Sequence, residues 1–120
     1  MRTAAALGLL LVLAAGCTRN VTYRICEACL EREGTLYCGR SFTNLRLHPD
    51  VPDEATRLAA GKTGCVQFAA HKGAGYSGPL YDKTLAACQA KVTLSELKHA
   101  RCSEEVRSES WNPRDGVDSY

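Results

Sequence analysis

The sequence lacks the features that mark proteins that span a membrane or bind nucleic acid. After residue 15 it has no second apolar run of membrane-spanning length, and only 7% of its residues are aromatic. Lysine and arginine (15) nearly balance aspartate and glutamate (13), so the formal net charge is only +2. A chain so close to neutrality has no strong attraction for nucleic acid or for an anionic lipid surface. We therefore expect no nucleic-acid partner.

The sequence also lacks a set of residues arranged for catalysis. Its three histidines, His48, His71 and His99, are scattered over predicted loops and exposed helix faces, where histidine is usually a solvated side chain. Residues 73–78 (GAGYSG) have the GxGxxG spacing of dinucleotide sites. A chain of this length, however, does not supply the several βαβ units of that fold. We therefore expect a protein that is not an enzyme and that holds no cofactor.

What the sequence does have is a distinctive start. Residues 1–3 carry a positive charge, and residues 4–15 (AAALGLLLVLAA) contain no charged side chain. A helix over this apolar run would rise about 18 Å, which is well short of the ~30 Å hydrocarbon core of a bilayer. The run therefore indicates the apolar region of a signal peptide and not a membrane span. Residues 13–17 (LAAGC) resemble the lipobox of bacterial lipoproteins, with Ala14 at the position where leucine is common.

The resemblance to the lipobox implies a processing pathway. In that family the cysteine thiol receives a glyceride, the peptide is cut before the cysteine, and the new amino terminus is acylated, for example with palmitate. Several acyl chains on one residue hold a protein firmly on a membrane. Thr18 occupies the next position, where aspartate resembles an inner-membrane retention signal of enteric bacteria. We therefore expect Cys17 to be lipidated and the protein to be anchored in the cell envelope, with the outer membrane favoured over the inner membrane.

Six further cysteines indicate a cross-linked domain. Cleavage before Cys17 would remove the signal peptide, residues 1–16, from the 120-residue chain and leave 104 residues, which is one small domain with a thin core. An even number of cysteines in a small exported domain predicts three disulfides, each worth about 2–4 kcal/mol. The pattern leaves the pairing open. The six residues are Cys26, Cys29, Cys38, Cys65, Cys88 and Cys102.

Three alternative roles stay open: a zinc site, thiol–disulfide exchange and inhibition of a hydrolase. Cys26, Cys29, Cys38 and Cys65 together have the sulfur ligands of a zinc site, because Cys26 and Cys29 form a CxxC. The same CxxC is also the motif of thiol–disulfide exchange, although the intervening Glu27 opposes a thiolate. The third alternative is inhibition of a hydrolase. Small lipoprotein inhibitors of lysozyme have an opening strand similar to residues 21–24 (VTYR) and a loop similar to residues 77–81 (SGPLY).

The first half of the domain predicts short strands and one short helix. Alternation of apolar and polar residues predicts a strand over residues 21–25. We also expect a returning strand over residues 35–42 and another short strand over 44–47. Residues 48–52 (HPDVP) predict a turn, because two prolines do not fit inside a regular element. Asp53 is expected to cap a helix through Ala60, which Gly61 would end. Residues 65–70 (CVQFAA) have the composition of a buried strand.

The second half of the domain predicts helices. Pro79 suits the first turn of a helix whose apolar stripe would point Cys88 into the core. Residues 93–96 (TLSE) match a capping box and predict a further helix that carries Cys102 near its end. The stripe consists of Tyr81, Leu85, Cys88 and Val92.

These elements together predict the fold class, the domain limits and a role. We expect a small, disulfide-stabilised α+β domain over residues 21–102, with short antiparallel strands followed by two or three short helices. Residues 17–20 would be a lipidated tether, and residues 103–120, which contain few apolar side chains, a mobile tail. The expected role is a non-enzymatic binding or structural module for an envelope protein or glycan.

Overall fold

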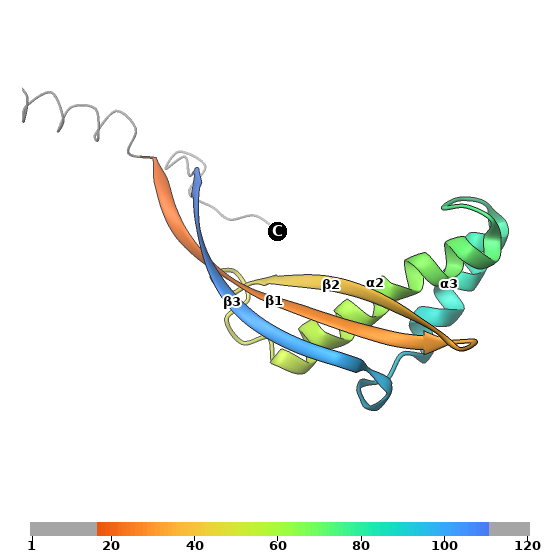
Figure 1. The fold of residues 1–120 in the computed structure, drawn as a ribbon. Coiled ribbons are helices and arrows are strands. Elements are labelled where there is room, and N and C mark those ends of the chain that lie inside the picture. The colour runs from red at the N-terminus through yellow and green to blue at the C-terminus, as the bar shows by residue number, and fades with distance from the viewer. Residues whose placement is uncertain (1–16, 111–120) are drawn as a thin grey trace, which may run out of the picture.

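The computed structural model describes residues 17–110 and has the predicted α+β class (Figure 1). The elements in chain order are β1 (Thr18–Arg32), β2 (Thr35–Asn44), α2 (Asp53–Gly73), α3 (Pro79–Lys91), the 3-10 turn η1 (Leu94–Glu96) and β3 (Lys98–Ser110). The three strands form one antiparallel sheet in the order β2-β1-β3, so that β1 is central. The helix α2 packs on one face of this sheet, and α3 packs against α2.

A two-residue turn sets the register of the hairpin between β1 and β2. Glu33 and Gly34 have φ angles of 53° and 79°. Positive φ at both turn positions gives a type I′ turn, whose twist matches that of the flanking strands. Arg32 therefore pairs directly with Thr35, and the pairing continues to the end of β2. The additional strand predicted over residues 44–47 is wrong, because β2 ends there and the chain turns towards α2.

On the face that α2 covers, the backbones of β2 and α2 are in direct contact. The register places Ala28 of β1 opposite Gly39 of β2. A Cβ atom added to Gly39 would lie 2.5 Å from the carbonyl oxygen of Ala60, and one added to Gly64 would lie 2.6 Å from that of Tyr37. A real Cβ has no room at these distances, so glycine is required on both sides of the contact. We call this side of the sheet the helix-covered face.

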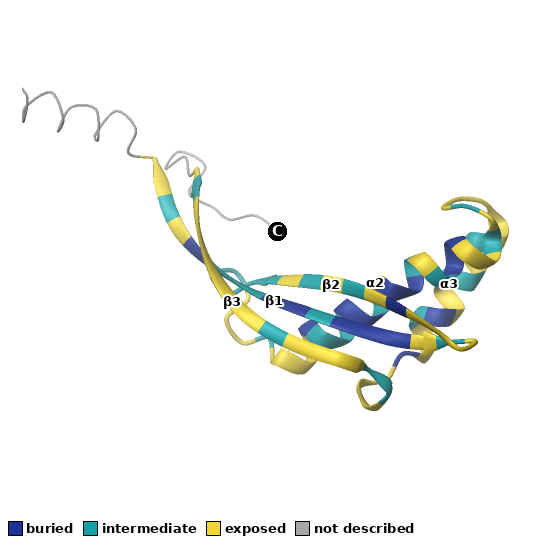
Figure 2. Ribbon diagram, viewed as in Figure 1, coloured by how far each residue is buried: buried dark blue, intermediate teal, exposed yellow. Residues whose placement is uncertain are grey.

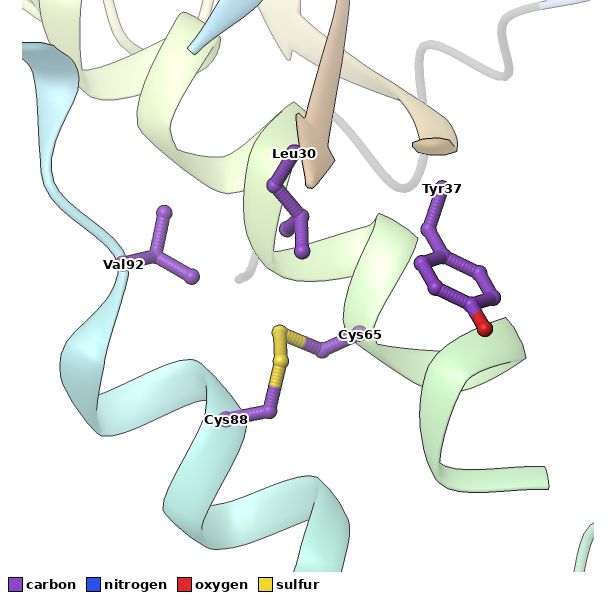
Figure 3. Close-up of a cluster of buried hydrophobic side chains, with 5 residues drawn as sticks. All are labelled: Leu30, Tyr37, Cys65, Cys88 and Val92. Carbon is purple, nitrogen blue, oxygen red and sulfur yellow. A yellow bond between two sulfur atoms is a disulfide. The ribbon is translucent and has the colours of Figure 1, made fainter. Parts of the chain in front are cut away.

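The core lies between the sheet and the two helices. Its main cluster is formed by Leu30, Tyr37, Cys65, Cys88 and Val92 (Figure 3). The Cys65–Cys88 disulfide joins α2 to α3 inside this cluster, and the ring of Phe68 meets that of Tyr37 edge-on at 5.4 Å between centroids. Figure 2 shows the resulting band of buried residues along β1 and the facing sides of the helices. The core is thin, and a disulfide occupies part of it.

The helix α3 confirms the stripe predicted from the sequence. Cys88 and Val92 are buried, at 5% and 7% exposure, and Leu85 packs partly against the same cluster. Pro79 lies at the start of the helix, as expected from its fixed φ angle and missing N–H. The glycine-rich residues 73–78 form the end of α2 and the loop between the two helices.

The start of α2 differs in detail from the prediction. The turn over residues 48–52 is confirmed, but Pro52 occupies the N-cap position and no side chain caps the helix. Asp53 is instead the first helical residue, and its carboxylate lies 2.7 Å from Nε of Arg24. Arg24 also donates a hydrogen bond to the carbonyl oxygen of Val51 at 2.6 Å. An arginine of β1 thus fixes the start of the helix against the sheet.

The helix α2 also runs much further than predicted. Gly61 does not end it, and residues 65–70 are helical instead of forming a strand. The space beside Gly61 is taken by Leu97, whose Cδ2 would lie 2.4 Å from an added Cβ. This glycine therefore serves close packing in the helix interior. The helix ends at Gly73, followed by Ala74 in the left-handed conformation with φ 59°.

The largest correction concerns residues after 93. The capping box at Thr93 and Glu96 forms as predicted, but it heads only the short turn η1. The chain then enters β3, so the predicted helix carrying Cys102 is wrong, and residues 103–110 belong to the sheet instead of a mobile tail. As an edge strand exposed along almost its whole length, β3 shows no apolar alternation that would reveal it. Residues 111–120 lie outside the described residues.

The sheet extends beyond the helices at the end where β1 begins (Figure 1). Residues 18–22 of β1 pair with residues 106–110 of β3, from Thr18 opposite Ser110 to Thr22 opposite Val106. We call this two-stranded segment the overhanging ribbon. The predicted tether over residues 17–20 is therefore wrong from Thr18 onwards, because those residues are already in a hydrogen-bonded strand.

Candidate functional site

All seven cysteines lie in the described part of the chain, and the three predicted disulfides are confirmed. Each disulfide joins a different pair of elements: Cys26–Cys102 joins β1 to β3, Cys29–Cys38 joins β1 to β2, and Cys65–Cys88 joins the helices. Cys17 is free and exposed, one residue before β1 at the outer end of the overhanging ribbon. No helix within residues 17–110 is both long and apolar enough to span a membrane.

The CxxC of β1 does not form a unit of its own. Cys26 and Cys29 each pair with a cysteine of a neighbouring strand and not with each other. The four cysteines considered as zinc ligands thus belong to three different disulfides, in which sulfur is not the thiolate that zinc binds. Among residues 17–110 no group of three or more His, Cys, Asp or Glu side chains is placed to hold a metal ion.

Side chains of the sheet that point away from α2 form what we call the open face. Alternate residues of a strand point to opposite faces, so the register assigns these side chains directly. No helix in the described range covers this face, yet Val21 and Ile25 are only 1% and 7% exposed. The open face includes Val21, Tyr23, Ile25, Glu27 and Cys29 of β1, Leu36, Cys38, Arg40 and Phe42 of β2, and Arg101, Ser103, Glu105, Arg107 and Glu109 of β3.

Long side chains from all three strands cover the open face. The guanidinium of Arg107 lies 5.3 Å from the ring centroid of Tyr23 and 5.6 Å from that of Phe42. The guanidinium of Arg40 also lies 5.6 Å from the ring centroid of Phe42. The hydroxyl of Tyr23 donates a hydrogen bond to Glu109. These cation–π contacts help to order Arg40 and Arg107 on the open face.

A hollow of about 710 Å³ lies on the open face next to this network. Its volume is in the range of small-molecule sites, about 300–1,000 Å³. Glu27, on the central strand, lies between two arginines: its Oε2 accepts from Nε of Arg101 at 2.9 Å, and its Oε1 lies 3.4 Å from Nε of Arg40. The residues around the hollow include Glu27, Cys29, Cys38, Arg40, His99 and Arg101.

A β-bulge places His99 at the hollow. In the pairing of β1 with β3, Ala28 stands opposite two residues, His99 and Ala100. His99 has φ 56°, in the left-handed region that glycine usually occupies in such a bulge. A side chain there costs roughly 1 kcal/mol, and bulges often redirect a side chain beside a functional site. The sequence predicts a solvated His99 on a loop or an exposed helix face and misses its place at the hollow, because the bulge exists only once β3 pairs with β1.

The other sequence-based candidates lie away from this hollow. His48 is in the turn before α2, and His71 is in the last turn of that helix. Residues 21–24 are in β1, where Arg24 meets the start of α2. Residues 77–81, beyond the other end of α2, form a loop and the first turn of α3. The two segments similar to lysozyme inhibitors therefore lie towards opposite ends of the molecule and do not form one surface.

One carboxylate of the helix-covered side has a shifted pKa. A hydrogen bond from the Arg32 guanidinium lowers the pKa of Glu96 below its ordinary value. Partial burial raises the pKa, but the backbone N–H of Thr93, which also donates to this carboxylate at 3.0 Å, lowers it further. This ion pair ties η1 to the end of β1 and has a structural role.

Comparisons with protein-family models, with curated proteins and with solved structures find no match to this chain.

Proposed function

We propose that the protein is a non-enzymatic binding module of the bacterial cell envelope, anchored through lipid on Cys17 and presenting the open face to an envelope partner. The observation that carries the proposal is the position of Cys17. It is the one cysteine outside the three disulfides, it is exposed, and it ends the lipobox-like segment LAAGC. A thiol that is to be acylated must be accessible and uncommitted to the fold, and Cys17 meets both requirements.

The overhanging ribbon supports this arrangement. Because β1 begins at Thr18, paired backbone joins the anchor residue directly to the domain. From Cys17 to Glu27 the strand rises about 33 Å at 3.3 Å per residue. In a chain anchored at Cys17, the hollow would stand clear of the lipid headgroups, where a partner in the envelope can reach it.

The composition of the open face supports a binding role. Arginine and aromatic residues are enriched at protein interfaces, and they contribute most of the binding free energy there. The open face combines Tyr23, Phe42 and three arginines, and Phe42 remains 49% exposed. Its side chains are already ordered by contacts with each other, which lowers the entropy lost on binding.

Metabolic labelling of the full chain with a palmitate analogue in a bacterial host tests the anchor. We expect the unmodified chain to be labelled and shortened, whereas Cys17→Ser remains unlabelled and accumulates as the uncut precursor. The double variant Cys29→Ser/Cys38→Ser is the matched control, because it also removes thiols but should keep the label. Normal cleavage and release of Cys17→Ser would overturn the lipoprotein assignment.

Membrane fractionation tests the proposed location. In an enteric host we expect the unmodified chain in the outer-membrane fraction. Thr18→Asp should move it to the inner membrane, because aspartate after the lipidated cysteine resembles the retention signal. Thr18→Ser is the control and should leave the distribution unchanged. Recovery of the unmodified chain from the inner membrane alone would contradict the outer-membrane location and leave the lipid anchor untouched.

A further inference from the structure

We propose that the hollow on the open face binds a ligand that carries one oxyanion, a carboxylate or a phosphate, on an apolar body. The binding chemistry follows from the hollow alone. The proposed function enters only in the source of the ligand, which would be an anionic component of the envelope. The inference therefore rests on the proposed function for that source alone.

The charges around the hollow leave an excess of one positive group. Glu27 is the single carboxylate between Arg40 and Arg101, whose side chains are 58% and 80% exposed. Glu27 contacts Nε and one terminal nitrogen of Arg101, and within the described residues neither arginine has a second acidic partner. A guanidinium has five N–H donors, so several of them remain for a ligand. An oxyanion is the group that two such arginines bind best.

Small groups keep the hollow open for the apolar part of a ligand. The Cys29–Cys38 disulfide contributes to its lining, together with Gly39 and Ala100. The disulfide is short and leaves the space above this part of the sheet open. Gly39 contributes backbone atoms to the lining, because a Cβ at this position would point to α2. The glycine at residue 39 is fixed independently, by its contact with α2 on the other face. A ring or a short apolar chain therefore has room beside the two arginines.

The polar groups of the hollow are held in place before any ligand arrives. Arg40, Glu27 and Arg101 come from three adjacent strands, opposite one another in the register. The disulfide between β1 and β2 lies next to them and cross-links two of these strands. The bulge adds His99 as a further wall, in a conformation that glycine would adopt more readily. Such preorganisation favours binding of a small ligand.

Titration of the ¹⁵N-labelled full chain in a non-ionic detergent tests the proposal by NMR. The probes are benzoate, phenyl phosphate and benzamide, which share a ring and differ in charge. We expect at least one anion to shift the Nε–H signals of Arg40 and Arg101 and the amides of residues 99–101 saturably, with benzamide at least about fivefold weaker. The more tightly bound anion distinguishes a carboxylate source from a phosphate source.

Four variants locate the binding. Arg40→Gln and Arg101→Gln should each weaken the better anion about fivefold or more, because each removes a charged hydrogen-bond donor. Arg107→Gln removes the same charge from the same face outside the hollow, and it should weaken binding less than about twofold. His99→Gly preserves the bulge, so the chain should stay folded, and it should weaken binding about threefold by removing the wall.

Three results would overturn the proposal. They are equal affinity for benzamide and the anions, equal losses for all three arginine variants, and the absence of saturable shifts with either anion. None of these results depends on labelling at Cys17, so failure of the hollow and failure of the lipid anchor are distinguishable.

Discussion

On the helix-covered face the sheet packs by close backbone contact, whereas on the open face it is covered by its own long side chains. Gly39 and Gly64 allow β2 and α2 to touch on the first face. On the second, Val21 and Ile25 are also buried, and arginine and aromatic side chains from the three strands contact one another beside them. A small sheet with one helical layer can thus bury both faces of its central strand. The open face keeps its charged groups near solvent, where a ligand can meet them.

One cross-strand disulfide on each face gives the largest test of this comparison. Cys26–Cys102 lies on the helix-covered face and closes a sequence separation of 76 residues, whereas Cys29–Cys38 lies on the open face with a separation of 9. Because each disulfide restricts the unfolded chain, its removal should lower the free energy of unfolding. The expected loss is about 4–5 kcal/mol for Cys26→Ala/Cys102→Ala and about 3 kcal/mol for Cys29→Ala/Cys38→Ala. Urea unfolding of the full chain measures both, and equal losses would contradict the dependence on loop length.

Adding one methyl group to β2 is expected to have the next largest effect. Gly39→Ala places a Cβ against backbone atoms of α2, so strand and helix must separate, at a cost of about 3 kcal/mol. The neighbouring Arg40→Ala, on the open face, should cost about 1 kcal/mol or less. Thermal unfolding compares the two variants. If Arg40→Ala destabilises more than Gly39→Ala, the contrast between the two faces is incorrect.

The aromatic network of the open face gives a smaller effect. Phe42→Leu keeps an apolar side chain but removes the ring that both Arg40 and Arg107 contact, and it should lower the free energy of unfolding by about 1 kcal/mol. The control Leu36→Met changes an exposed apolar residue of the same strand and face, and it should cost less than about 0.5 kcal/mol. Urea unfolding measures both, and equal effects would mean that the cation–π contacts do not stabilise this face.

The Glu96–Arg32 ion pair gives the smallest effect and a pH dependence. Because Arg32 lowers the folded-state pKa of Glu96, the carboxylate stabilises the fold above its unfolded-state pKa, and this stabilisation is lost as the pH falls through the lowered value. Glu96→Gln should cost about 1 kcal/mol or less at pH 7 and nothing at the acid end of this window. The control Glu31→Gln breaks an exposed pair with Lys98 and should change stability by less than about 0.5 kcal/mol. A pH-independent cost for Glu96→Gln would contradict this explanation.

Local signals in the sequence predicted the structure where neighbouring residues decide it. The turn at residues 48–52, the helical stripe that buries Cys88, and the capping box at residues 93–96 all form. Each depends on prolines, apolar spacing or side-chain caps within one or two turns of chain. The even number of six cysteines also predicted three disulfides, because the number of disulfides follows from the cysteine count without any knowledge of the pairing.

Signals failed where partners distant in sequence decide the structure. Gly61 is a residue type that often ends a helix, but Leu97 fills the space beside it and the helix continues. Residues 65–70 contain enough apolar side chains for a strand, yet they are helical, and Cys65, Ala69 and Ala70 are buried with helical spacing in α2. The polar β3 shows its strand character only through pairing with β1. The site at His99 therefore appears only in the folded molecule, since its bulge depends on that pairing.

The overhanging ribbon has a mechanical consequence for a chain held at Cys17. A flexible tether would let the domain rotate independently of its attachment, but a hydrogen-bonded strand that starts at Thr18 acts as a lever arm. Over a length of about 33 Å to Glu27, a tilt of about 10° at the attached end moves the hollow by roughly 6 Å. The angular freedom of Cys17 in the membrane would therefore set the volume that the hollow searches for its ligand.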